Sequence, residues 1–190
     1  MKVVNVNNPQ HRDACLARLC AEVYGREAGI APLVTFAGTL GVLIEQEAAR
    51  VIALTDEQSR PVALTLLVLD ELGESMEVVL LTALGNERIA KPAERLIAEL
   101  ALKAPLRVTA MDAKQESMFR ASGIKHWLDG PQGERIGLGP KHAATGMDDL
   151  AKTMHYNERA VLQAFKQDEK LFDAYKTRFV NGLDNFPATL

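Results

Sequence analysis

The sequence predicts an α/β domain, with a mixed central sheet flanked by helices, followed by a helical C-terminal extension. Short β-rich segments alternate with amphipathic helical segments over residues 1–140. Residues 147–190 carry only helical patterns. The chain has 190 residues, 47% of them hydrophobic, which is enough for one domain with a substantial core. We therefore expect a domain over residues 1–140 and a two-helix extension over residues 147–190.

The first half of the chain carries a helix-start signal near its beginning and several strand patterns. Asn8 followed by Pro9 is typical of a helix start, because asparagine caps the first turn and proline fits inside it. Residues 62–69 are almost entirely apolar, which predicts a central strand covered on both faces. The other elements expected here are a strand over residues 2–6, a helix over 36–46, and strands over 51–54 and 77–84.

The second half of the core domain is expected to alternate helices and strands. A helix opens near Lys91 and Pro92, and Pro105 ends it. After it we expect a strand over 106–111, a helix over 115–121, a hairpin of strands 124–128 and 134–138, and a linker over 140–146.

Two helices are expected in the extension, one from Asp148 to about residue 165 and one from Asp168 to about residue 180. The second carries three aromatic residues on one side, which is too much apolar surface to leave in water. This side either docks on the chain's own sheet or covers a partner subunit, as in a homodimer formed through these helices.

Composition excludes several classes of function. The net charge is −3, from 22 basic and 25 acidic residues, and no run of five like charges occurs, which argues against nucleic-acid and membrane partners. The N-terminus shows no secretory signal. Cys15 and Cys20 lie in one helical pattern as packing residues, and the four histidines show no ligand spacing. A reduced cytoplasmic protein without a metal site is expected.

The segment from Glu77 to Lys103 carries the strongest indication of chemistry. A helix that starts just after a strand offers free N–H groups and the positive end of its dipole to an anion. Arg88 and Lys91 add positive charge there, which predicts a phosphate-bearing cofactor. The alternative is that these side chains simply extend into water.

Over residues 1–140 the order of elements resembles the GNAT fold of acetyl-CoA-dependent N-acetyltransferases. That family's pyrophosphate loop has the pattern Gln/Arg-x-x-Gly-x-Gly/Ala, and here the corresponding residues read Arg-Ile-Ala-Lys-Pro-Ala. Arg88 and Ala93 match its ends, whereas Lys91 replaces the glycine, so the loop is degraded. A lysine there either obstructs the pyrophosphate or pairs with it. The chain thus resembles a divergent GNAT member with a largely antiparallel sheet.

The resemblance implies a site as well as a fold. Acetyl-CoA would be the co-substrate, with its pantetheine arm on the main chain of Leu81 and Ala83 and its pyrophosphate at Arg88, Lys91 and the N–H groups that open the helix at Ala93. Glu77 would be the general base for an amine acceptor, either a small molecule or a peptide. No metal is implied.

The tyrosine that often serves as general acid in the GNAT family has no counterpart in this sequence. Phe119 stands where the family often has a tyrosine acid, and phenylalanine cannot protonate a leaving thiolate. Together with the degraded loop, it leaves open an alternative: a catalytically silent GNAT-like module for binding or dimerisation.

Overall fold

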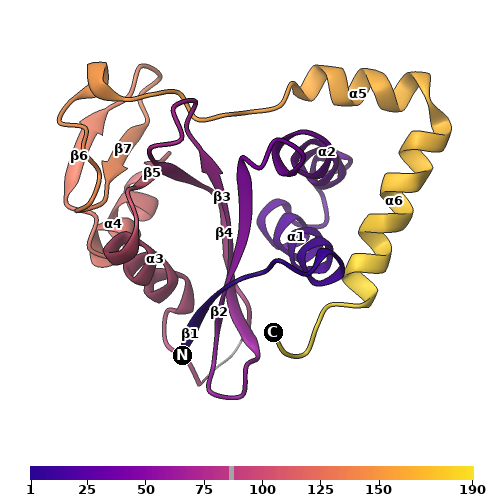
Figure 1. Ribbon diagram of the computed structural model, residues 1–190, viewed down its shortest axis with the longest axis horizontal. Helices are drawn as coiled ribbons and strands as arrows, with labels where there is room; N and C mark the ends of the chain where they lie inside the picture. The colour runs from indigo at the N-terminus through magenta and orange to yellow at the C-terminus, as the bar shows by residue number, and fades with distance from the viewer. Residues whose placement is uncertain (86–87) are drawn as a thin grey trace.

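The computed structural model describes residues 1–85 and 88–190 (Figure 1). Over these residues a seven-stranded sheet runs in the order β1-β2-β3-β4-β5-β7-β6. All neighbouring strands are antiparallel except β4 and β5, which are parallel, so the predicted mixed, largely antiparallel sheet is confirmed. The strands are β1 (Lys2–Asn5), β2 (Ala49–Thr55), β3 (Pro61–Leu69), β4 (Met76–Ala83), β5 (Leu106–Ala110), β6 (His126–Asp129) and β7 (Arg135–Leu138).

Helices cover both faces of the sheet (Figure 1). On one face lie α1 (Pro9–Tyr24), capped by the Asn8 side chain as predicted, and α2 (Ala31–Gly38), which continues into a π-helical segment, η1 (Thr39–Ile44). On the other face lie α3 (Pro92–Lys103) and α4 (Ala113–Ala121). The helix predicted over residues 36–46 starts earlier than expected. Pro32 occupies its first turn, where the missing N–H leaves no helical bond unmade.

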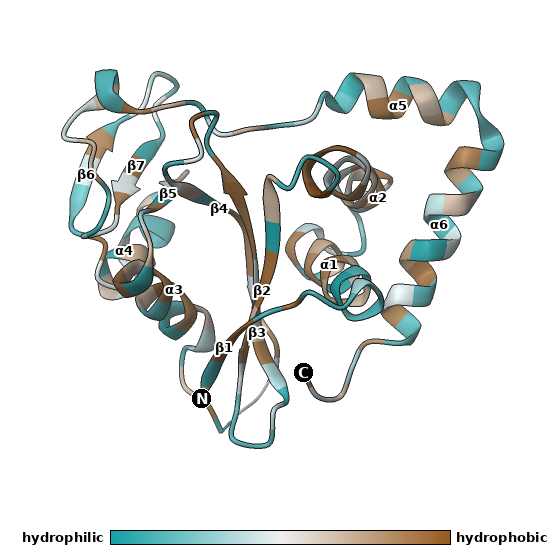
Figure 2. Ribbon diagram, in the orientation of Figure 1, coloured by the Kyte–Doolittle hydropathy of each residue, from teal (hydrophilic) through white to brown (hydrophobic). Residues whose placement is uncertain are grey.

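The core is divided between the two faces of the sheet. Residues 62–68 of β3 are all buried, which confirms the prediction of a central strand covered on both sides. Leu64 and Leu66 pack toward α1 and α2, whereas Leu67 packs toward α3. Figure 2 shows the resulting concentration of hydrophobic residues in the central strands. Cys15 and Cys20 are fully buried in α1, and burial raises the pKa of both thiols to about 12.

The extension differs from its prediction at its start. The helix expected from Asp148 begins only at Glu158, after a short 3-10 turn, η2 (Met147–Asp149), and an extended segment. We call residues 150–157 the strap. The strap hydrogen-bonds to the hairpin between β3 and β4, because the Glu71 N–H donates to the Lys152 carbonyl at 2.8 Å. This bond, together with the one that the Met154 N–H donates to the Leu69 carbonyl, holds the strap extended in place of the helix that the local pattern favoured.

The two helices after the strap are α5 (Glu158–Gln167) and α6 (Glu169–Asp184). They pack on α1 and α2 of the same chain, not on the sheet (Figure 1). Phe179 meets Phe36 of α2 edge-to-face with ring centroids 5.2 Å apart. A Cβ added at Gly182 would lie 3.0 Å from the Ala17 Cβ, so glycine allows α6 to approach α1 closely. The aromatic side of α6 thus packs against the other helices of this chain, where Phe172, Tyr175 and Phe179 are partly buried. The homodimer through these helices stays a prediction.

Asp70 organises the hairpin between β3 and β4, next to the strap. Its buried carboxylate accepts hydrogen bonds from the main-chain N–H groups of Leu72, Glu74 and Ser75 and, at 2.7 Å, from the Ser75 hydroxyl. Burial by itself raises the pKa of Asp70, but these hydrogen bonds, led by that of the Ser75 hydroxyl, outweigh it and lower the pKa below the ordinary value of an aspartate.

Replacing Asp70 with asparagine is expected to lower the free energy of unfolding by about 2 kcal/mol at neutral pH, since buried N–H donors lose an acceptor. A folded-state pKa below the unfolded value stabilises the protein above the unfolded pKa, and this stabilisation disappears as the pH falls. The difference between wild type and Asp70→Asn in urea unfolding should therefore shrink below about pH 4. Glu74→Gln on the exposed turn is the control. A difference that stays constant with pH would contradict this role.

Candidate functional site

The parallel strands β4 and β5 pair only where they begin. Met76 is opposite Leu106 and Glu77 is opposite Arg107, and within the described residues the ladder ends there. On its other side, β4 has a bulge at Val79, which no β3 residue pairs with and whose side chain is 46% exposed. A bulge bends a strand and increases its twist. The bulge thus accompanies the separation of β4 from β5.

Beyond the bulge, the main chain of β4 alternates between the β3 side and the β5 side. The Leu84 N–H donates to the Val62 carbonyl at 2.9 Å, so residues 80, 82 and 84 turn their main-chain groups toward β3. Leu81 and Ala83, the residues predicted to hold a pantetheine arm, therefore turn theirs toward the side where the pairing with β5 has ended.

Glu77 lies at the start of β4 with both carboxylate oxygens engaged. The Thr109 hydroxyl, from β5, donates to Oε1 at 2.7 Å, and the Thr153 hydroxyl, from the strap, donates to Oε2. Arg107 Nε lies 4.0 Å from Oε2, and the Glu77 side chain is 17% exposed. A carboxylate has about four acceptor positions, so the two hydroxyls leave others for a further donor.

Lys91 precedes α3 in a left-handed backbone conformation, with φ 52° and ψ 54°. This conformation favours glycine, because a Cβ crowds the neighbouring carbonyl. Lys91 therefore keeps the backbone shape that suits the glycine of the GNAT pattern. Its ammonium lies 3.4 Å from the Glu94 carboxylate, and its side chain is 71% exposed. Pro92 begins the helix, and Ala93 follows in its first turn.

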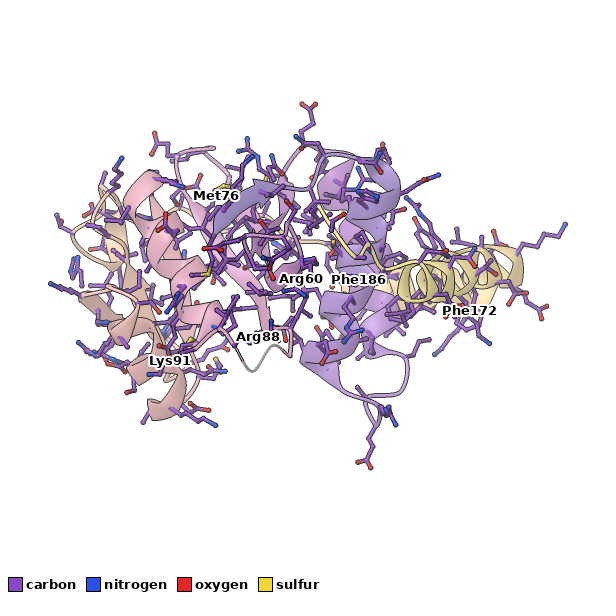
Figure 3. All side chains as sticks on the ribbon, turned by 90° about the horizontal axis from the view of Figure 1, so that it is seen from below. Arg60, Met76, Arg88, Lys91, Phe172 and Phe186 are labelled. Carbon is purple, nitrogen blue, oxygen red and sulfur yellow. The ribbon has the colours of Figure 1, made fainter. Side chains whose placement is uncertain are left out.

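Arg88 lies at the same end of the molecule as Lys91 (Figure 3). It borders a cavity of about 220 Å³ together with Arg60, from the loop between β2 and β3. The Arg60 guanidinium donates to Asp56 at 2.8 Å. Sequence analysis did not single out Arg60, because nothing local relates it to a residue 28 positions later. Asp56 and Glu57 line the same cavity, so two carboxylates balance the two arginines there.

The comparison with protein-family models finds no match, and neither does the comparison with curated proteins. Among solved structures, the chain is similar to an aminoglycoside 6'-acetyltransferase type Ii, with a TM-score of 0.51 and 16% identity over 73% of this chain and 95% of that one. The chain has the GNAT acetyltransferase fold.

Two further solved structures are similar at lower scores. One is the catalytic domain of a Tetrahymena histone acetyltransferase in complex with coenzyme A, with a TM-score of 0.47 and 13% identity over 76% of this chain and 93% of that one. The other is a Vibrio cholerae spermidine N-acetyltransferase in complex with coenzyme A and spermine, with a TM-score of 0.43 and 12% identity over 72% and 92%.

Phe119 lies in α4, at the position where the resemblance led us to expect a tyrosine. Phe119 is 5% exposed and packs in the core beneath α3, as its apolar character predicted. The Ser122 hydroxyl is used within the helix end, where it donates to the Met118 carbonyl at 2.9 Å. Across residues 1–85 and 88–190, no group of three His, Cys, Asp or Glu residues is arranged to hold a metal, and no helix is long and apolar enough to cross a membrane.

Proposed function

We propose that the protein is an acyl-CoA-dependent N-acyltransferase that transfers an acetyl group from acetyl-CoA to a primary amine on a small molecule or peptide. The observation that carries the proposal is the separation of the parallel strands β4 and β5 directly after Glu77. The pantetheine arm contains amide groups, which pair with a strand edge as another strand would. Leu81 and Ala83 turn their main-chain groups toward that side and are the proposed partners.

The pyrophosphate of the same ligand is assigned to the start of α3. Arg88 and Lys91 supply positive charge, and the N–H of Ala93 adds to the positive end of the helix dipole. Pro92 contributes no N–H, so the two cations carry more of this interaction than in a glycine-rich loop. Arg60 borders the same cavity as Arg88, but its guanidinium is paired with the Asp56 carboxylate and adds no net charge there.

Glu77 is the proposed general base. A primary amine is mostly protonated at neutral pH, and it must lose a proton before its nitrogen can attack the thioester carbonyl. The proton passes to the Glu77 carboxylate, a C–N bond forms, and the C–S bond breaks. Coenzyme A leaves as a thiolate and takes up, through water, the second proton that the nitrogen releases as the amide forms, because Phe119 has none to give. The transfer is direct, without a covalent enzyme intermediate.

A second candidate is a catalytically silent GNAT-like module that binds a ligand or a partner. The specific observation that favours it is the carboxylate of Glu77, which is mostly buried and already receives two hydroxyl donors. The two candidates differ in whether thioester is consumed.

Calorimetric titration with acetyl-CoA, with free coenzyme A as the comparison, tests the proposal. Saturable binding at one site is expected, followed by release of coenzyme A when an amine is added. No heat of binding at millimolar acetyl-CoA would overturn the proposed function. Binding without thiol release from any amine would favour the silent module.

Replacing Lys91 with glycine is expected to weaken acetyl-CoA binding about tenfold, because one phosphate-facing charge is lost. Thermal stability should not fall, since glycine adopts the left-handed backbone of this position without strain. Lys103→Ala is the matched control, because Lys103 also pairs with a glutamate of α3 but lies at the opposite end of the helix. Tighter binding by Lys91→Gly would show that the lysine obstructs the pyrophosphate.

A further inference from the structure

The strap is fixed from two sides where it passes Glu77. On the side of the β3–β4 hairpin, the Met154 N–H donates to the Leu69 carbonyl at 2.9 Å, and Lys152 accepts from Glu71. On the side of β5, Arg107 Nη1 donates to the Ala151 carbonyl at 3.1 Å. Main-chain bonds on either side of Thr153 therefore set its place over the start of β4.

This anchoring delivers the Thr153 hydroxyl to one oxygen of Glu77, while the Thr109 hydroxyl binds the other. A glutamate side chain has several rotatable bonds, and its carboxylate turns freely unless donors hold it. One hydroxyl on each oxygen fixes both the position and the rotation of the group. The two donors come from different elements, β5 and the strap, so the carboxylate is held between them.

We infer that Thr153 is a positioning residue for Glu77, so that the C-terminal segment supplies part of the active site. The inference rests on the proposed function, in which Glu77 takes a proton from the amine. The proton goes to an acceptor position of the carboxylate that the hydroxyls leave open, and Thr153 keeps its own proton. A base held in one orientation meets the amine more often in a reactive geometry.

Attachment of the extension does not require this hydroxyl. The main chain of residues 151–154 already bonds to the hairpin and to Arg107, and α6 docks through Phe179. A valine at position 153 has nearly the same shape as threonine and keeps every one of those contacts. Thr153→Val therefore removes the donor to Glu77 and little else.

The test compares Thr153→Val, Thr153→Ser and the control Thr145→Val. Thr145 donates its hydroxyl to Asp149 at 2.8 Å, so the control removes a hydroxyl–carboxylate bond that lies just before the strap, away from Glu77. Release of coenzyme A from acetyl-CoA is followed with a thiol reagent, using butylamine and lysine amide as probes. Cys15 and Cys20 are fully buried, so the reagent detects the released thiol.

Thr153→Val should lower kcat about tenfold, the effect of one hydrogen bond to a charged group. The KM for acetyl-CoA should stay within twofold of the wild-type value. Thr153→Ser should keep at least half of the wild-type kcat, because serine retains the donor, and Thr145→Val should match wild type.

Four results would overturn the inference. In the first two, wild type releases thiol. Either Thr153→Val keeps kcat within twofold of wild type, or Thr153→Ser is as impaired as Thr153→Val. In both cases Thr153 does not position Glu77, and the proposed function stands. A rise in kcat in Thr153→Val would show that the strap blocks the amine. Wild type that binds acetyl-CoA but releases no thiol with either probe overturns the proposed function, and this inference with it.

Discussion

Replacement of Phe36 by alanine is expected to lower the free energy of unfolding by about 3–5 kcal/mol. Phe36 is fully buried in α2, and its ring meets the edge of Phe179 in α6. The substitution leaves a cavity among α1, α2 and α6 that these packed helices fill only in part. Chemical denaturation followed by circular dichroism measures the change.

A double-mutant cycle with Phe179→Ala separates the contact from the cavity. Phe179 is only partly buried, so its own replacement should be less damaging. The coupling between the two rings should be about 1 kcal/mol, the range measured for edge-to-face pairs. Val180→Ala, one residue further and 44% exposed, is the control that should change stability little. Additive effects of the two phenylalanines would argue against this docking of α6.

Glu77→Gln is expected to reduce kcat for amine acetylation by at least about 100-fold, the usual contribution of a general base. Glutamine keeps the shape of the side chain but cannot take the proton. Acetyl-CoA affinity should stay within about twofold, because the proposed ligand contacts lie at Leu81, Ala83 and the start of α3. Steady-state kinetics and calorimetry measure the two quantities.

The control for this variant is Glu71→Gln, which neutralises an exposed carboxylate on the hairpin that binds the strap. It should leave kcat and the affinity for acetyl-CoA unchanged. A Glu77→Gln protein with full activity would exclude Glu77 as the base. Loss of acetyl-CoA binding along with activity would indicate that Glu77 holds the fold of the site together.

Local patterns were sufficient for most of the sheet. The apolar run of β3 and the Asn8–Pro9 start of α1 each depend on a few neighbouring residues, and both are confirmed. The strap was predicted as helix because Leu150 and Met154 fit a helical stripe. Its partners lie in the β3–β4 hairpin, far away in the sequence, and periodicity within a window does not detect such pairing.

In the candidate site, too, local patterns indicate some residues, whereas others come together only through the fold. Positive charge at the start of a predicted helix indicated Arg88 and Lys91, and the resemblance to the GNAT family added Glu77. Neither observation indicated Thr109 and Thr153, which donate to Glu77 from 32 and 76 positions away. A single threonine has no signature in a sequence, and only the folded chain brings its hydroxyl to a carboxylate.

The docking of α6 on α1 has a consequence for the way the chain acquires its fold. Arg178 of α6 binds Asp13 of α1 at 2.6 Å, across 165 positions of sequence. Contacts between residues so far apart in the sequence are typical of slow steps in folding. During synthesis, the apolar surface of α1 and α2 stays open to solvent until the last helix has emerged. Until α6 is made and docks, this uncovered apolar surface favours aggregation of the nascent chain.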